Sequence, residues 1–276
     1  MIDARTKYVA IFGDPVSHSL SPQMHNAAFN HLGLNMAYLA FKVEQAADAA
    51  IAMRRLGIFG ASITVPHKES IIPHLDGLDE MSRAIGAVNT VFAQERRLLG
   101  YNTDWLGVVR ALEQVTDPSG KSCLILGAGG AARAAIYGLQ RKSVEVLLMN
   151  RNEARGRTLA AKMNCSFVNW QSWGQIDVGL VINATPAGMS TRGDQSLVPR
   201  HWLQAGMVVM DMVYFPVETR LLRDAKAAGC LCVSGLDMLL YQGTAQFEIW
   251  TGKEAPVGVM RQTLMESLED ETDKDH

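Results

Sequence analysis

Residues Ser122 to Ala135 read SCLILGAGGAARAA, and this stretch decides the fold. The apolar run Cys123 to Leu126 predicts a buried parallel strand, because strands covered on both faces are nearly continuous in hydrophobic residues. The next residues fit G-x-G-x-x-G/A, in which the first glycine makes a tight turn and the second lets the backbone approach a pyrophosphate. An alanine-rich helix follows, whose N-terminal N–H groups would hold the phosphates. The expected contacts to a dinucleotide are Gly127, Ala128, Gly129, Gly130 and Ala131.

A second apolar run, Val144 to Met149, closes a βαβ unit of the length that such a site needs. About 20 residues after the glycines, a dinucleotide-binding chain normally carries an acid for the ribose 2′-hydroxyl. This chain has no acid at that point, and Arg151 and Arg155 could pair with a 2′-phosphate instead. The pattern therefore predicts NADP rather than NAD, although the two arginines could also be the solvated start of a helix. The residues expected to line this end of the cofactor are Asn150, Arg151, Asn152 and Arg155.

The composition is that of an ordinary globular protein. The 276 residues are 48% hydrophobic and 20% charged, and the net charge of −2 gives no sign of nucleic-acid binding. The four cysteines lack metal-ligand spacing and are expected to be reduced. No signal peptide, apolar spanning segment or lipidation motif is visible. We therefore expect a cytoplasmic protein that has a small-molecule ligand and no metal, nucleic-acid or membrane partner.

Two serines stand before the first predicted helix, in His18-Ser-Leu-Ser-Pro22. Ser21 is a suitable N-cap and Pro22 suits the first helical position, so a structural role explains Ser21. Ser19 has no such explanation. Two hydroxyls at a strand-to-helix turn could together bind a carboxylate.

Two ionisable residues follow predicted strands. The strand at Phe59 to Val65 leads into Pro66 and His67, where a helix is expected to begin, with Lys68 in its first turn. The helix dipole would oppose the positive charge there, which suits a proton-transfer role, but a solvated lysine is an equal alternative. Asp104 precedes a predicted helix, and N-capping is the simpler explanation for it.

Later loops and helices complete the predicted site. The strands at Val178 to Ile182 and Val208 to Met212 should end at the same sheet edge as the glycine loop, where open α/β sheets bind ligands. The ends of these strands and the loops after them are therefore expected to border the nicotinamide; the residues there are Thr185, Met212 and Tyr214. Gly235, which follows the last predicted strand, is expected at the same edge. A helix from about residue 237 carries Gln242 and Gln246 on one face.

This order of elements predicts an α/β protein of two domains. Residues 1–104 form a substrate domain, and residues 105–235 form a Rossmann-type, doubly wound dinucleotide domain. The helices of residues 236–276 are expected to return to the first domain, which would leave a cleft between the two.

Five groups of residues, in this order, resemble the shikimate dehydrogenase family. They are His18-Ser-Leu-Ser-Pro22 with His25-Asn26, Thr64-Val-Pro-His-Lys68, Ala87-Val-Asn-Thr90, Tyr101-Asn-Thr-Asp104, and Gly235-Leu-Asp-Met-Leu239 with Gln242. The resemblance extends over nearly the whole chain and includes the glycine loop, Asn183-Ala-Thr185 and Asp211-Met-Val-Tyr214.

The resemblance implies a reversible NADP-linked reduction of 3-dehydroshikimate to shikimate, a step of aromatic amino acid biosynthesis, by a monomer or homodimer. Ser19 and Ser21 would bind the substrate carboxylate, and Lys68 would be the general acid/base, with Asp104 beside it. The other implied substrate contacts are Thr64, Asn89, Asp104, Tyr214 and Gln242. A quinate or aminoshikimate dehydrogenase remains an alternative. A dinucleotide sensor without turnover is less favoured because Lys68 and Asp104 are both present.

The sequence departs from the family pattern at a few places. Ser62 stands where asparagine is frequent, and Trp105 and Asp237 each stand where glycine is frequent. These departures bear on the substrate and the turnover rather than on the fold.

Overall fold

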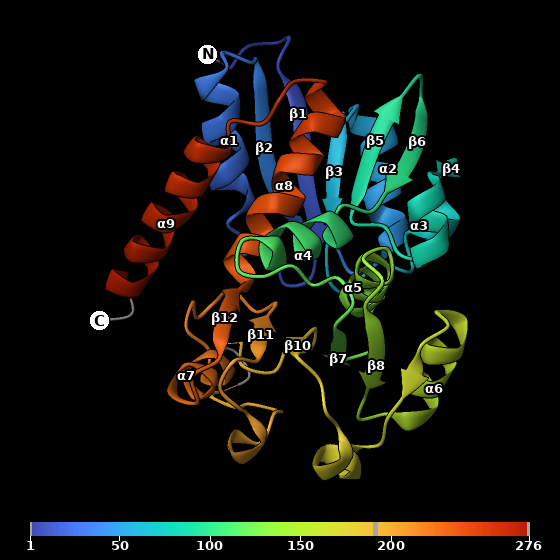
Figure 1. Ribbon diagram of the computed structural model, residues 1–276. Coiled ribbons are helices and arrows are strands. Elements are labelled where there is room, and N and C mark those ends of the chain that lie inside the picture. Colours follow the sequence, from blue (N-terminus) through green and yellow to red (C-terminus); the bar gives the residue numbers. More distant parts are fainter. Residues whose placement is uncertain (1, 190–192, 275–276) are drawn as a thin grey trace. The chain divides into compact units, whose positions relative to one another are not determined.

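The computed structural model describes residues 2–189 and 193–274. The chain divides into two compact units: unit 1 comprises residues 1–103 and 242–276, and unit 2 comprises residues 104–241. Each unit is built on one sheet with helices packed on it (Figure 1). The expected fold class, two α/β domains with a Rossmann-type second domain, is confirmed.

Unit 1 has a mixed sheet in the order β2-β1-β3-β5-β6-β4. β1 pairs in parallel with both β2 and β3, whereas β5 runs antiparallel to β3 and β6. The strands are β1 (Lys7–Gly13), β2 (Met36–Lys42), β3 (Gly60–Ile63), β4 (Gly77–Leu78), β5 (Thr90–Gln94) and β6 (Arg97–Tyr101).

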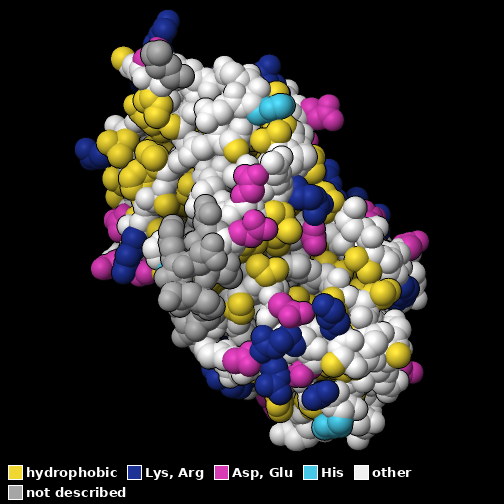
Figure 2. Space-filling view, turned by 90° about the vertical axis from the view of Figure 1, so that its left-hand side faces the viewer, with side chains coloured by type: hydrophobic (Ala, Val, Ile, Leu, Met, Phe, Trp, Pro, Cys, Tyr) yellow, Lys and Arg dark blue, Asp and Glu magenta, His cyan; other side chains and the backbone are white. Residues whose placement is uncertain are grey.

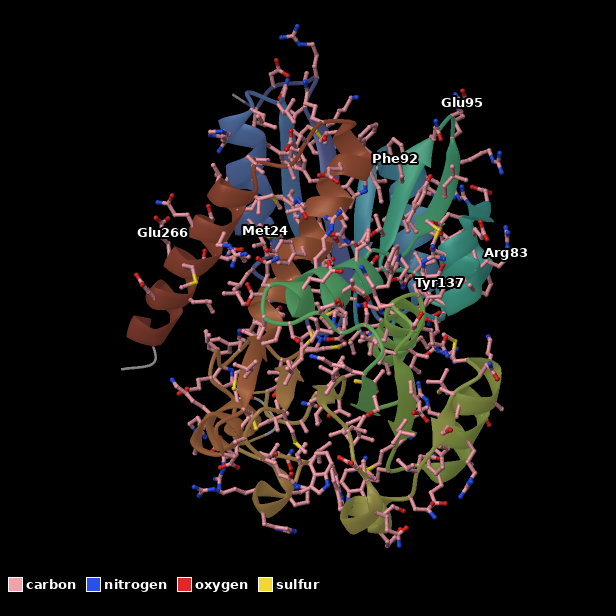
Figure 3. All side chains as sticks on the ribbon, viewed as in Figure 1. Met24, Arg83, Phe92, Glu95, Tyr137 and Glu266 are labelled. Carbon is pink, nitrogen blue, oxygen red and sulfur yellow. The ribbon has the colours of Figure 1, made fainter. Side chains whose placement is uncertain are left out.

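Helices cover both faces of this sheet (Figure 1). Small residues of α2 pack on one face against β1 and β3 in a buried apolar cluster. On the other face, the indole of Trp250 in α8 lies where a Cβ on Gly60 would come within 2.6 Å of it. Met24 of α1, labelled in Figure 3, packs against Gly243 of α8 just as closely. The helices are α1 (Ser21–His31), α2 (Ala46–Leu56), η1 (Ile72–His74), α3 (Glu80–Ile85), α8 (Gly235–Thr251) and α9 (Val257–Lys274).

The helix expected to begin at Pro66 or His67 does not form, so that prediction was wrong. Turns follow β3 and lead to the short 3-10 helix η1. The carbonyl of Lys68 accepts a hydrogen bond from Val88 N–H at 2.7 Å instead of one from its own segment. Pro73 then removes the N–H that an α-helix would need at that position. Because Lys68 lies in a turn, no helix dipole acts on it there.

Unit 2 has a sheet in the order β12-β11-β10-β7-β8-β9, in which every described pairing is parallel. The chain starts in the middle at β7, proceeds outward through β8 and β9, and then crosses to β10. This is the doubly wound strand order, and the order reverses between β7 and β10. The strands are β7 (Ser122–Leu126), β8 (Glu145–Met149), β9 (Ser166–Phe167), β10 (Leu180–Asn183), β11 (Val208–Asp211) and β12 (Leu231–Ser234).

The helices of unit 2 also lie on both faces of its sheet. Side chains of α4, α5 and α6 form one apolar cluster, and side chains of α7 form a second cluster with Trp202 on the opposite face. Trp105 of α4 packs edge-on against Tyr137 of α5, with ring centroids 5.7 Å apart (Tyr137 is labelled in Figure 3). Trp105 therefore helps to hold α4 on α5. The helices are α4 (Asp104–Glu113), α5 (Gly130–Gln140), α6 (Glu153–Lys162), η2 (Trp170–Gln175), η4 (Arg200–Trp202) and α7 (Arg220–Ala227).

Candidate functional site

Asn89, which directly precedes β5, is the centre of a buried polar cluster in unit 1. Its Oδ1 accepts the N–H of Thr103 and the hydroxyl of Thr90, both at 2.7 Å. Its Nδ2 donates to Thr103 Oγ1 at 2.9 Å and to Gln242 Oε1 at 3.2 Å. Because a backbone N–H can only donate, the bond from Thr103 fixes which way the Asn89 amide faces. The fold thus brings together Asn89 and Gln242, which lie far apart in the sequence. We call Asn89, Thr90, Thr103, Gln242 and Gln246 the amide cluster.

Gln246 connects the amide cluster to the interior of unit 1. Its Nε2 donates to Asn89 O at 3.1 Å and to Thr90 Oγ1 at 2.9 Å. Its Oε1 accepts the hydroxyl of Ser62 at 2.9 Å, and Ser62 in turn accepts the hydroxyl of Tyr38 at 2.6 Å. This chain of bonds has one direction, from Tyr38 through Ser62 to Gln246. Ser62 and Tyr38, which sequence reasoning did not place in the site, together supply the bond that holds Gln246.

An aromatic group with His25 at its centre lies behind these residues. The His25 ring stacks on Tyr38 with centroids 4.7 Å apart and lies 5.2 Å from the Trp250 ring. Burial lowers the pKa of His25 to about 3, and Gln246 is the one group that acts in the other direction. His25 is therefore neutral near neutral pH and serves as part of the packing.

The two serines at the start of α1 divide the capping role differently from the prediction. The helix begins at Ser21 itself, and Leu20 holds the N-cap position, so the prediction that Ser21 is the N-cap was wrong. The hydroxyl of Ser19 instead accepts the N–H of Ser21 at 3.3 Å and so serves part of the capping function. Ser21 is buried and Ser19 is half-buried.

Asn26 fixes the position of α1 on the sheet. Its Nδ2 donates to Tyr38 O at 2.9 Å, and its Oδ1 accepts Tyr38 N–H at 2.8 Å. Tyr38 lies in β2, the edge strand of the sheet. The helix that begins at Ser21 is thus hydrogen-bonded to the sheet through one side chain.

Lys68 is half-buried and lies in a turn that is held on both sides. Besides the bond from Val88 to its carbonyl, the ring of the neighbouring His67 donates through Nε2 to Val43 O at 2.9 Å. Thr64, at the start of the turn, packs so closely on Gly13 that a Cβ there would lie 2.3 Å from the Thr64 methyl group. The backbone at Thr64 and Lys68 is therefore well fixed without a helix.

Asp104 belongs to unit 2, where it is the first residue of α4, and it is buried. The residues before it are anchored in unit 1, because Asn102 Nδ2 donates to Ala87 O at 2.9 Å and Thr103 binds Asn89. The structure does not test the expected roles of Lys68 and Asp104, and these roles stay predictions.

The glycine loop between β7 and α5 has the features that its sequence predicts. Gly127 has φ +113°, and a Cβ there would lie 3.0 Å from Thr185 Cγ2 and 3.1 Å from Ala184 O. Only glycine suits that conformation and that contact. Gly129 is the N-cap of α5 in an extended conformation, and a Cβ there would meet nothing within 4 Å. The loop therefore leaves open space in front of the helix N-terminus, which is the space that a pyrophosphate needs.

In the segment after β8, Asn150, Asn152 and Arg155 make hydrogen bonds that hold the local structure. Asn152 is the N-cap of α6 and accepts the N–H of Arg155 at 3.0 Å. The Arg155 side chain donates through Nε to Ala128 O at 3.1 Å, so it holds the glycine loop. Asn150 donates to Asn152 O at 2.8 Å. Arg151 and Arg155 are both exposed, but the Arg155 side chain is engaged with Ala128, so Arg151 is the better placed of the two to meet a ligand from solvent.

The loops after β10 and β11 meet at the same edge of the sheet. Thr185, in the first loop, lies against Gly127, and Met212 N–H donates to Asn183 O at 3.0 Å. Gly235 begins α8 so close to the second loop that a Cβ there would lie 2.6 Å from the carbonyl oxygens of Met212 and Val213. Tyr214 is half-buried in this loop.

A metal centre and a membrane span find no support in the described residues. Within residues 2–189 and 193–274, no group of three or more His, Cys, Asp or Glu side chains is arranged to hold a metal ion. No helix in these ranges is both long and apolar enough to cross a membrane. On the face shown in Figure 2, basic and acidic side chains are interspersed rather than gathered by sign.

Comparison with known proteins decides the family. The family model for the shikimate dehydrogenase substrate binding domain matches residues 11–91, and that for the shikimate 5′-dehydrogenase C-terminal domain matches residues 235–265. A protein of Moorella thermoacetica named shikimate dehydrogenase (NADP(+)) is 45% identical over 281 residues, which cover 97% of this chain and 95% of that protein. The chain belongs to the shikimate dehydrogenase family.

Solved structures agree with this assignment to the shikimate dehydrogenase family. The shikimate 5-dehydrogenase of Thermus thermophilus, solved in complex with NADP(H) and shikimate, superposes with a TM-score of 0.88 at 35% identity, over 95% of this chain and 100% of that chain. The quinate dehydrogenase of Corynebacterium glutamicum, solved in complex with NAD, superposes with a TM-score of 0.87 at 28% identity, over 95% of this chain and 99% of that chain.

Proposed function

We propose that this chain is an NADP-dependent shikimate dehydrogenase that interconverts shikimate and 3-dehydroshikimate in aromatic amino acid biosynthesis. The observation that carries the proposal is the 45% identity, over nearly the full chain, to a protein named for that activity. Two features of the chain support it. In the doubly wound unit 2, the glycine loop is open at Gly129, and in unit 1, buried amide and hydroxyl groups surround Asn89.

The residues of unit 2 fit NADP. The N-terminus of α5 offers N–H groups to the pyrophosphate, and Gly129 leaves room for its approach. Arg151 is exposed near the end of β8, where the 2′-phosphate of NADP is expected, and a guanidinium binds a phosphate through charge-assisted bonds. We assign Arg155 a supporting role, because it holds Ala128 of the glycine loop. The other proposed cofactor contacts are Gly127, Gly130, Ala131, Asn150, Asn152, Thr185, Met212 and Gly235.

The residues of unit 1 fit a small polyhydroxy acid. We propose that Ser19 and Ser21 bind the carboxylate, since hydroxyl groups donate hydrogen bonds to a carboxylate in a way that apolar residues cannot. Asn89 and Gln242 bind substrate hydroxyls, and the amide cluster holds them in a fixed orientation. Thr64 and Tyr214 are the remaining proposed contacts.

The chemistry needs one hydride acceptor and one proton acceptor. NADP⁺, when bound, supplies the acceptor for the hydride that leaves the carbinol carbon of shikimate. We propose that neutral Lys68 takes the hydroxyl proton as the ketone forms, and that protonated Lys68 returns it in the reverse direction. Asp104 accepts a hydrogen bond from a substrate hydroxyl and so orients the substrate.

The test is a steady-state assay with shikimate and quinate, each with NADP and with NAD. Shikimate with NADP should give the highest kcat/KM. A higher value for quinate with NAD would instead support the quinate dehydrogenase that the Corynebacterium structure represents. Lys68→Met should lower kcat about 10²–10⁴-fold, the usual range for general acid–base catalysis, with less effect on KM. The matched control is Lys253→Met at an exposed lysine, which should leave kcat unchanged. A loss below about threefold in Lys68→Met would remove Lys68 from the proton step and make Tyr214 the next candidate.

We also infer a cytoplasmic location. All four cysteines are free thiols, as is usual in a reducing compartment. Cell fractionation tests this location, and light scattering on the purified protein decides between the monomer and the homodimer.

A further inference from the structure

A buried carboxylate lies at the edge of the unit 2 sheet where the cofactor loops begin. Asp211 is the last residue of β11 and is 1% exposed. Its Oδ1 accepts Asn183 Nδ2 at 2.9 Å and Val213 N–H at 3.1 Å, and its Oδ2 accepts the hydroxyl of Thr219 at 2.6 Å. We call Asn183, Asp211 and Thr219 the Asp211 cluster.

The direction of each bond is fixed by its neighbours. Val213 N–H can only donate. Asn183 must present Nδ2 to Asp211, because its Oδ1 accepts the N–H and the hydroxyl of Thr185 at 3.1 and 2.7 Å. Thr219 caps α7 by accepting Leu222 N–H at 3.3 Å, so its single proton is available for Asp211. Three donors therefore face this carboxyl group, which is the arrangement that an ionised carboxylate needs and a protonated one does not.

No cation balances this charge within the described residues. Burial raises the pKa of Asp211 to about 6, against the opposing effect of the bonds from Thr219, Val213 and Asn183. The charged groups next to Thr219 are engaged elsewhere: Arg220 binds Asp224 at 2.9 Å, and Glu218 lies 3.5 Å from Lys226. In the neighbouring strand β12, Ser234 lies opposite Asp211. Among residues 212–217 of the loop after β11, Tyr214 is the one titratable side chain.

The Asp211 cluster ties together the loops that approach the glycine loop. Asn183 also donates to Ala187 O at 3.1 Å, so the loop after β10 folds back on the cluster. A Cβ on Gly188 would lie 3.6 Å from Thr219, which ends the loop after β11. Through Thr185, which Asn183 holds, the same bonds reach Gly127.

We propose that Asp211 is a positioning residue for the cofactor: its ionised carboxylate holds residues 184–188, after β10, and residues 212–219, after β11, in the form that binds the nicotinamide half of NADP, and protonation of Asp211 weakens that binding. This inference rests on the proposed NADP-dependent function. Asp211 touches loops rather than cofactor, so its effect is confined to the part of the ligand that those loops meet.

The experiment compares two ligands, NADP and ADP-ribose 2′-phosphate, by calorimetric titration between pH 8 and pH 5. The second ligand carries the same 2′-phosphate and the same pyrophosphate but lacks the nicotinamide, so the titration of the 2′-phosphate cancels in the ratio of the two affinities. The variants are Asp211→Asn and, as the matched control, Asp224→Asn, which removes another buried carboxylate of unit 2 that lies outside the cluster.

At pH 8, Asp211→Asn should weaken NADP about tenfold, the size of one lost charge-assisted hydrogen bond, and change the affinity for ADP-ribose 2′-phosphate by less than about twofold. At pH 5, where the wild-type carboxyl is itself protonated, the two proteins should agree within about twofold. Asp224→Asn should leave the affinity ratio unchanged. An equal loss of both ligands, or no loss of either, overturns the inference.

A second measurement covers the case in which Asp211→Asn does not fold. The wild-type ratio of NADP affinity to ADP-ribose 2′-phosphate affinity should then fall about tenfold from pH 8 to pH 5, and a flat ratio overturns the inference. Turnover of shikimate is measured separately. A wild-type protein that binds NADP with this pH dependence but does not oxidise shikimate would refute the proposed substrate and leave the role of Asp211 intact.

Discussion

Two glycines, two residues apart in one loop, should respond to the same substitution in opposite ways. Gly127→Ala places a side chain at φ +113°, a conformation that costs an L-residue about 1–3 kcal/mol. The added methyl group would also lie 3.0 Å from Thr185 Cγ2 and 3.1 Å from a backbone oxygen, which adds overpacking of about 1 kcal/mol or more. We expect unit 2 to lose about 2–4 kcal/mol of its free energy of unfolding, a fall in Tm of roughly 4–16 °C.

Gly129→Ala should leave the stability nearly unchanged and remove cofactor binding. Gly129 has φ −100° and ψ −170°, which any residue adopts, and its Cβ would meet nothing within 4 Å. The change in stability should stay within about 0.5 kcal/mol. The methyl group would, however, fill the space through which the backbone approaches a pyrophosphate, so NADP affinity should fall at least about tenfold.

Thermal unfolding with and without NADP measures both effects at once. Gly127→Ala should show a lower Tm in the absence of NADP, and Gly129→Ala should show a normal Tm that NADP no longer raises. A Gly129→Ala protein that binds NADP as tightly as the wild type would refute the assignment of this loop to the pyrophosphate. A normal Tm for Gly127→Ala would refute the strain argument.

Three further predictions concern single side chains. Arg151→Ala should weaken NADP at least about tenfold and NAD much less in binding titrations, and an equal loss of both would contradict a contact to the 2′-phosphate. Ser21→Ala should raise KM for shikimate without changing NADP affinity, whereas Ser19→Ala should also lower Tm, because the Ser19 hydroxyl accepts a helix N–H; an unchanged KM in both variants would remove the serines from the site. His25 takes up its proton near pH 6.5 when unfolded but only near pH 3 when folded, so its contribution to stability is complete above pH 6.5 and is lost toward pH 3. Denaturant unfolding should therefore show wild type losing about 1.4 kcal/mol more per pH unit than His25→Phe over that window, and parallel curves would contradict a buried neutral His25.

The sequence predicted most where one local rule decides the structure. The glycine loop, the parallel strands beside it and the position of Gln242 and Gln246 on one helix face all follow from short-range patterns, and the fold class was confirmed. The helix at Lys68 was predicted wrongly because the partner of its carbonyl, Val88, comes from a distant segment that no local pattern reveals. The sequence also did not show which of two nearby residues has which role. The hydroxyl of Ser19, not that of Ser21, accepts an N–H at the start of α1, and the side chain of Arg155 binds Ala128 of the glycine loop.

The Asp211 cluster and the Tyr38–Ser62 pair could not be found from the sequence for a related reason. Their partners lie on other strands, loops and helices, and a single serine or aspartate in or at the end of an apolar run has no periodic pattern of its own. The one usable signal is an acid that ends a run of apolar residues, as Asp211 ends β11, because such an acid is buried with the strand. Such an acid must find several donors, and that requirement marks it as a residue with a defined task.

The clasp of Asn26 on Tyr38 has a consequence for how copies of this chain can meet. An edge strand exposes a row of donors and acceptors that another chain's strand can join, which is a common start of aggregation. In β2 the side-chain amide from α1 already occupies the N–H and the carbonyl of Tyr38, as a short piece of neighbouring strand would. These two backbone groups are therefore not available to a strand from another copy of the chain, and the edge of the unit 1 sheet is protected at this residue.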